Sequence, residues 1–184
     1  MSEAEELSRY SLTATPEFQR TYQTLGDLNI WEHYEYTQNV DFLKENFYLL
    51  KDACIFFVDF LIENNAGELV ASPTISPENV YILSNGRHAW VTEGCTMDSQ
   101  ILDELFIACE AACKILDSDA ELAKIVAKMR AKLPATKVGK NGGIMEWMEQ
   151  KKEAEPRHRH ISHLFGLFPG NAISPETTPE LAAA

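Results

Sequence analysis

The chain has 184 residues and carries 16 lysines and arginines against 28 aspartates and glutamates, a formal net charge of −12. Its length fits a single domain, and 45% hydrophobic residues with 10% aromatics suffice for a core, which excludes wholesale disorder. No basic stripe interrupts the acidity, so neither nucleic acid nor an anionic membrane is an expected partner. The first ten residues lack the basic and apolar regions of a signal peptide, and the compartment stays unknown.

The first third of the chain is predicted to be helical. Thr15–Glu17 combines an N-cap residue, a proline at the first helical position and an early acid, which together indicate a helix start. From residue 40 onward, apolar residues recur every three or four positions. They form one face of Leu43, Phe47, Leu50, Cys54, Phe57 and Leu61, and a second face of Phe42, Leu49, Phe56 and Phe60. A helix that is apolar on two faces is expected to be covered on both, in a multi-helix assembly.

The next segment is predicted to be non-helical. Asn64–Gly67 should end the long helix, and prolines at positions 73 and 77 exclude a helix directly after it. Val80–Leu83 and Ala89–Thr92 are predicted to pair as a small hairpin around an Asn-Gly turn.

Helix is predicted to return at Thr96, with Thr96 as its N-cap. A capping box formed by Ser118 and Glu121 should open the following helix, giving an αα-hairpin with almost no loop. Near the end of the chain, Thr178–Leu181 repeats the helix-start pattern and only three alanines follow. Because one helical turn is not stable alone, we expect the chain to be cut inside a larger domain.

Glu78 is the first candidate for chemistry. It lies directly after a proline, in a non-helical segment that can aim one carboxyl group into a cavity. Burial there would raise its pKa and suit it to general-acid catalysis. From the residue pattern alone, an ordinary loop acid is the more common interpretation, and both remain open.

A second candidate is the run Arg157–His163, which holds three of the five histidines. A metal site at these histidines is conceivable. However, two arginines would repel a cation and the run itself contains no acid or cysteine, so no metal or other cofactor is expected. The alternatives are hydrogen bonding to hydroxyl groups of a ligand and a half-buried structural turn.

Three further candidates have structural alternatives. Asp98 is predicted to be an acid in the first turn of a helix, which stabilises the helix dipole or lines a pocket. A sugar ring could stack on a wall of aromatic side chains. The candidates for such a wall are Trp147, with Glu146, and the aromatic segment Trp31–Tyr36. Core packing is the more common use of each alone.

Taken together, seven elements resemble glycoside hydrolase family 95, which comprises inverting α-L-fucosidases with some members acting on α-L-galactosides. The resemblance covers residues 27–184, whereas residues 1–26 form a divergent segment. In chain order, the matching elements are Trp31–Thr37, Phe42-Leu43, the Phe56-Phe57 helix, Ser76–Asn79, Thr96–Asp98, Gly143-x-x-Glu146-Trp147 and His158-Arg159-His160-x-Ser162-His163-Leu164.

The resemblance implies an all-α fold, in which residues 27–184 form an incomplete (α/α)6 catalytic barrel with a small β-hairpin insertion. It implies that Glu78 is the general acid and that a fucosylated oligosaccharide or glycan is the substrate. It also implies substrate contacts from Asn79, Asp98, Trp147, His160 and His163.

The chain also departs from this family. The resemblance assigns water activation to an asparagine-rich motif upstream and an aspartate downstream, and both are absent from this sequence. In addition, Asn39 stands where the family is expected to have an aspartate. We therefore expect little activity from the chain alone. Family members are often exported, but no signal is present here. The alternative hypothesis is a non-catalytic helical remnant or interaction module.

Overall fold

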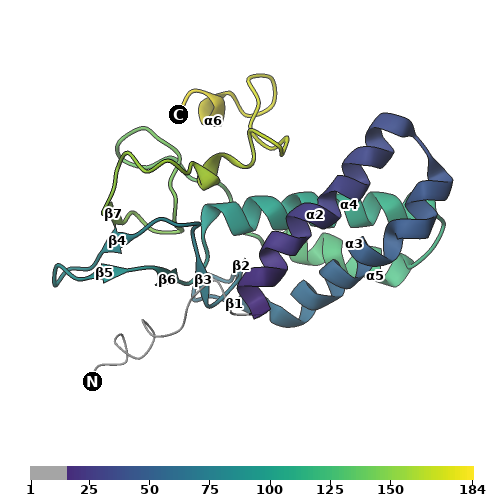
Figure 1. Cartoon of the computed structure of the whole chain (residues 1–184), viewed down its shortest axis with the longest axis horizontal. Helices are drawn as coiled ribbons and strands as arrows, with labels where there is room; N and C mark the ends of the chain where they lie inside the picture. The colour runs from purple at the N-terminus through teal and green to yellow at the C-terminus, as the bar shows by residue number, and fades with distance from the viewer. Residues whose placement is uncertain (1–15) are drawn as a thin grey trace.

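The computed structural model describes the backbone of residues 16–184 and the side chains from residue 23 onward. Its longer helices gather on one side of the molecule and its short strands on the other (Figure 1). The helices are α2 (Pro16–Thr37), α3 (Val40–Phe60), α4 (Thr96–Ile115), α5 (Ala120–Arg130), α6 (Pro179–Ala182) and the 3-10 turn η2 (Ser162–Leu164). The predicted starts at Pro16, Thr96 and Pro179 are confirmed. Residues 1–15, most of the predicted divergent segment, lie outside the described residues.

Residues 16–184 hold three small antiparallel sheets, where one hairpin was expected. The strands are β1 (Ile62–Glu63), β2 (Leu69–Val70), β3 (Thr74–Ile75), β4 (Tyr81–Ile82), β5 (His88–Ala89), β6 (Val91–Thr92) and β7 (Lys152–Glu153). The predicted pairing is confirmed for β4 and β5, and β7 adds to the other edge of β4. By contrast, β6 pairs with β3, and β1 pairs with β2.

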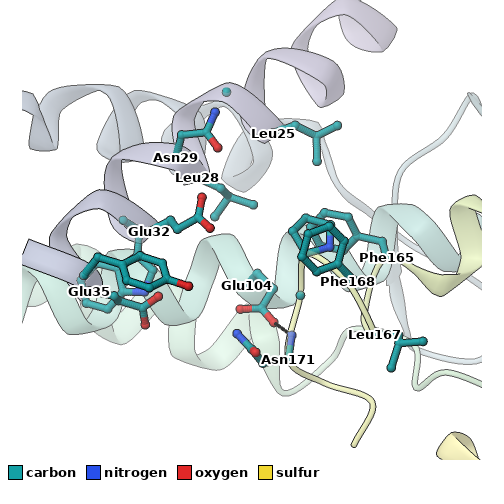
Figure 2. A pocket seen from close by; sticks show the side chains of 15 residues that line it. Leu25, Leu28, Asn29, Glu32, Glu35, Glu104, Phe165, Leu167, Phe168 and Asn171 are labelled. Carbon is teal, nitrogen blue, oxygen red and sulfur yellow. Dashed lines mark hydrogen bonds between the residues drawn. The ribbon is translucent and has the colours of Figure 1, made fainter.

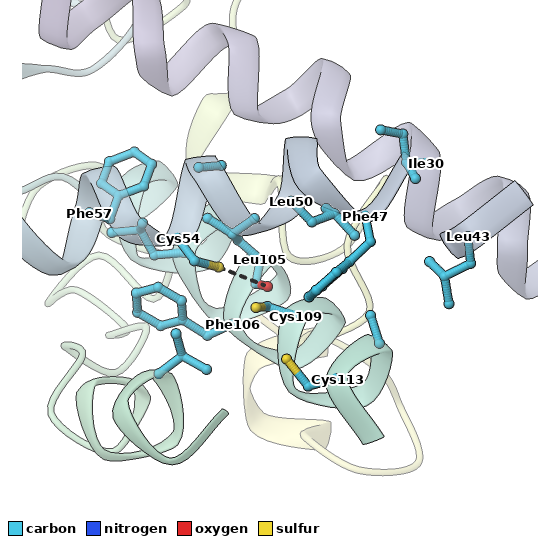
Figure 3. Close-up of a cluster of buried hydrophobic side chains, with 14 of the residues drawn as sticks. Ile30, Leu43, Phe47, Leu50, Cys54, Phe57, Leu105, Phe106, Cys109 and Cys113 are labelled. Carbon is cyan, nitrogen blue, oxygen red and sulfur yellow. Dashed lines mark hydrogen bonds between the residues drawn. The ribbon is translucent and has the colours of Figure 1, made fainter. Parts of the chain in front are cut away.

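Helix α4 lies at the centre of the helical part and contacts α2, α3 and α5. The first predicted face of α3 is buried against it, with Leu50 and Phe57 opposite Leu105 and Phe106 (Figure 3). The second face of α3, with Phe56 and Phe60 stacked at 5.3 Å between ring centroids, is only partly buried. The expected αα-hairpin is confirmed, since α4 and α5 pack against each other after a short turn.

Two predicted helix caps are wrong. Residue 95, not Thr96, caps α4; Thr96 is buried and donates its hydroxyl to the carbonyl of Met145 at 2.6 Å. Neither Ser118 nor Glu121 caps α5, because Asp119 occupies the N-cap position with φ 51° and no side-chain capping bond. Asp119 instead pairs with Lys51 of α3 at 2.5 Å, so a partly exposed contact between two helices' segments replaces the local one.

A second, smaller core lies at the N-terminal end of α4. Every residue from Thr96 to Leu102 is buried, and Ile101 packs with Tyr81, Trp147 and Phe165. This cluster joins the strands and the C-terminal loops to the helices. The described chain is therefore helix-rich with small sheets, and none of its described helices is long and apolar enough to cross a membrane.

Candidate active site

A polar pocket of about 380 Å³ lies among the C-terminal loops, beside the second core. Three residues predicted to contact substrate, Asn79, His160 and His163, line it. Other polar lining residues are Asn141, Glu146, Glu153 and His158. The pocket thus brings together segments that lie up to 105 positions apart in the sequence, from Asn79 to Ala184.

Glu78 lies next to this pocket and is 58% exposed. Its Oε2 atom accepts a hydrogen bond from the guanidinium of Arg159 at 2.5 Å and lies 3.8 Å from Nε2 of His160. The other ring nitrogen of His160 is 3.3 Å from the carbonyl oxygen of Pro77. The structure therefore joins the two motifs that the sequence singled out, with the carboxyl group of one beside the imidazole of the other.

Glu146 occupies the buried side of the pocket. One carboxylate oxygen accepts hydrogen bonds from the hydroxyls of Ser76 and Ser162, and the other lies 2.7 Å from Nδ1 of His163. Burial alone raises the pKa of Glu146, but the contact with His163 and the hydroxyl of Ser76 outweigh it, so the pKa is lowered. The sequence placed Glu146 in a motif beside Trp147 but did not predict its contacts with the two serines and His163.

The other two predicted contacts, Asp98 and Trp147, are buried and do not line this pocket. Trp147 packs edge-on against Tyr81, with ring centroids 5.5 Å apart, and its backbone bridges to Cys95. Burial raises the pKa of Asp98 to about 6, although hydrogen bonds with Thr74 and Cys95 oppose the shift. Their contact with a substrate stays a prediction.

A larger cavity of about 750 Å³ lies between α2, α4 and the loop 165–171. Glu32 and Glu35 of α2 and Glu104 of α4 surround it together with Phe165 and Phe168 (Figure 2). Trp31 and Tyr36, part of the predicted aromatic wall, also line this cavity rather than the one beside Glu78. The candidate residues therefore line two different cavities: the aromatic residues of α2 line the larger one, and the histidines line the smaller one.

The metal hypothesis finds no geometric support, because no group of three or more potential ligands is assembled within residues 16–184. The rings of His158 and His160 meet edge to face at 5.1 Å between centroids. Carboxyl and imidazole groups beside a pocket can instead donate and accept protons and hydrogen-bond ligand hydroxyls. That chemistry is typical of a hydrolase site.

Comparison with known proteins identifies the class. Residues 21–184 match the model of the glycosyl hydrolase family 95 catalytic domain. The chain is 43% identical over 157 residues to alpha-L-fucosidase 2 of Arabidopsis thaliana, and 31% identical over 152 residues to "Probable alpha-fucosidase A" of Aspergillus niger. These matches cover 84% and 79% of this chain.

The chain belongs to glycosyl hydrolase family 95, as the resemblance predicted. It spans 18% of the length of each of these two relatives, so it corresponds to one part of a much longer protein in both cases.

Proposed function

We propose that this chain supplies the acid-bearing part of a glycoside hydrolase that removes terminal α-L-fucosyl groups, or α-L-galactosyl groups, from oligosaccharides with inversion. In the complete domain, its helix pairs would form part of an (α/α)6 barrel. The observation that carries the proposal is Glu78 beside His160, at the edge of a pocket also lined by Asn79 and His163. The family membership and the names of the relatives support the same substrate class.

In this proposal, Glu78 protonates the glycosidic oxygen as the bond to the sugar breaks. Asn79, His160 and His163 hydrogen-bond the sugar hydroxyls, while Asp98 and Trp147 contribute from the adjacent buried layer. An inverting enzyme also needs a group that activates water on the opposite face of the ring. The resemblance assigns that role to motifs outside this sequence.

The test uses the longest natural open reading frame that contains these residues, assayed on a 2′-fucosylated oligosaccharide. Glu78→Gln should lower kcat by roughly 10²–10⁴-fold, because general-acid catalysis has this magnitude. The loss should be much smaller on a nitrophenyl fucoside, whose leaving group needs no proton. NMR of the first product should detect β-L-fucose, as inversion requires.

Glu68→Gln is the matched control, since Glu68 is a partly exposed, hydrogen-bonded glutamate in the β1–β2 turn. Equal losses on both substrates would assign Glu78 another role. Absence of turnover by the wild-type protein would contradict the proposed function and favour the non-catalytic alternative.

A further inference from the structure

The Glu146 cluster connects three segments of the chain through one buried carboxylate. The side chain of Glu146 is 4% exposed. Its backbone is fixed to the start of α4, because the amide of Thr96 donates to the Glu146 carbonyl at 3.1 Å. Its side chain reaches Ser76 in one segment and Ser162 in another. The two hydroxyls also lie 3.0 Å apart, so the three groups form a closed triangle.

The two serines lie close in sequence to the groups proposed to act on the sugar. Ser76 precedes Glu78 by two positions, and Ser162 follows His160 by two positions. A turn closed by the amide of Asn79 and the carbonyl of Ser76, at 2.9 Å, transmits the position of Ser76 to the Glu78 segment. Fixing both serines therefore constrains the separation of the segment that bears Glu78 from the segment that bears His160.

The same carboxylate lies directly beside the imidazole of His163. Nδ1 lies 2.7 Å from the carboxylate oxygen, and without a proton between them the two lone pairs would repel. Nδ1 is buried and makes no hydrogen bond of regular geometry, so the carboxylate oxygen at 2.7 Å is the polar contact from which its protonated form is inferred. His163 also lines the pocket, so a ring whose Nδ1 holds the proton leaves Nε2 as its acceptor nitrogen.

The serines contact the glutamate and not the imidazole, so the cluster is not a nucleophilic triad, in which the base must reach the hydroxyl. We propose that Glu146 is a positioning residue for the proposed glycosidase reaction. It fixes the Nδ1–H form of His163 and holds the Glu78 and His160 segments at a working separation. This inference rests on the proposed function, but its first measurement does not.

The first measurement is NMR of the imidazole nitrogens in the wild-type chain and in Glu146→Gln. A glutamine has nearly the same shape, but its oxygen is required by the two serine hydroxyls, so its NH₂ group faces His163. Nδ1 must then accept, and the nitrogen shifts should report loss of the Nδ1 proton. Glu146→Asp keeps the charge and should retain the Nδ1–H form, whereas Glu68→Gln should change nothing. An unchanged Nδ1–H signal in Glu146→Gln would overturn the inference.

The second measurement is turnover by the longer protein. Glu146→Gln should lower kcat by roughly 10- to 100-fold with a smaller change in KM, as expected for a misplaced catalytic group. Glu146→Asp should recover part of the loss. If the wild type hydrolyses fucosides and Glu146→Gln retains full kcat, the positioning role is wrong. If the wild type hydrolyses none, the proposed function fails, and the NMR result alone decides whether Glu146 controls His163.

Discussion

In the core between α3 and α4, buried side chains such as Leu50, Phe57 and Leu105 contact one another through apolar surface. Beside the pocket, the buried Glu146 accepts hydrogen bonds from two serine hydroxyls and lies 2.7 Å from an imidazole nitrogen. The first region derives its stability from excluded water, which is not directional. The second needs each donor opposite its acceptor, because an unpaired buried polar group destabilises the fold.

The apolar core therefore mainly stabilises the fold, whereas the polar cluster mainly determines where the groups of the site lie. An apolar core tolerates exchange among side chains of similar volume, since its contacts lack a required direction. A polar cluster responds to the loss of one proton or one oxygen atom even when the volume is unchanged. Substitutions in the apolar core should therefore change mainly the free energy of unfolding, whereas substitutions in the polar cluster should change mainly the position and protonation of its groups.

The largest effect on stability is expected from Phe57→Ala. Phe57 is 1% exposed and packs within the main core. Deleting a buried ring leaves a cavity, and such changes cost about 3–5 kcal/mol. Urea denaturation should measure this loss in the free energy of unfolding. Tyr48→Ala on the same helix is the control, because Tyr48 is 57% exposed and its loss should stay within about 0.5 kcal/mol. Similar losses in both variants would contradict the assignment of the core.

A smaller, pH-dependent effect is expected from Asp98→Asn. The pKa of Asp98 rises from the ordinary 3.8 to about 6 in the folded chain, because burial disfavours its charged form. The folded state therefore binds the proton more tightly than the unfolded state does. The resulting stabilisation is complete below about pH 4 and is lost as the pH rises through about 6.

Asp98→Asn carries no titrating group at this position, so its free energy of unfolding should lose this part of its dependence on pH. The difference corresponds to at most about 3 kcal/mol between pH 4 and pH 7. Thermal unfolding of both proteins across this range would measure it. Glu68→Gln, at a more exposed carboxylate, controls for the general effect of removing one negative charge. Parallel pH profiles of the wild type and Asp98→Asn would contradict the buried, protonated state of Asp98.

The periodic part of the fold could be predicted from the sequence. The spacing from Leu43 to Phe57 predicts the buried face of α3 because helical contacts repeat every three or four residues. The end of this helix was predicted too late, at Asn64–Gly67, whereas α3 ends at Phe60. Residues Ile62–Glu63 pair with Leu69–Val70, and this pairing with a later strand has no signature in the helical period.

The candidate site was predictable only where a motif carried it. Glu78 and His160 were singled out by their motifs, and the structure places them 3.8 Å apart. The role of Glu146 depends on Ser76, 70 positions earlier, and on a serine and a histidine further along the chain. No local pattern encodes such contacts, because tertiary folding brings the groups together. The burial of Trp147 was likewise decided by packing on Tyr81 rather than by its own sequence neighbourhood.

The smallest effect on stability is expected at the exposed edge of the site, from Arg159→Gln. Arg159 and Glu78 form an ion pair at 2.5 Å, but their side chains are 73% and 58% exposed. Water and salt screen such a pair, so its removal should cost less than about 1 kcal/mol. A double-mutant cycle with Glu78→Gln, measured by urea unfolding, isolates the coupling energy, which should fall with added salt.

A coupling energy as large as the loss in Phe57→Ala would contradict the comparison, because an exposed pair would then stabilise the fold as strongly as a buried ring. A small coupling energy would show that the two polar contacts of the site, those of Glu146 and of Glu78, have different roles. The buried contact of Glu146 would determine where the segments lie, while the exposed pair of Glu78 could exchange its partner without disturbing the fold. A proton donor has to exchange partners, since its carboxyl group must leave a neighbouring side chain to reach the glycosidic oxygen of a substrate.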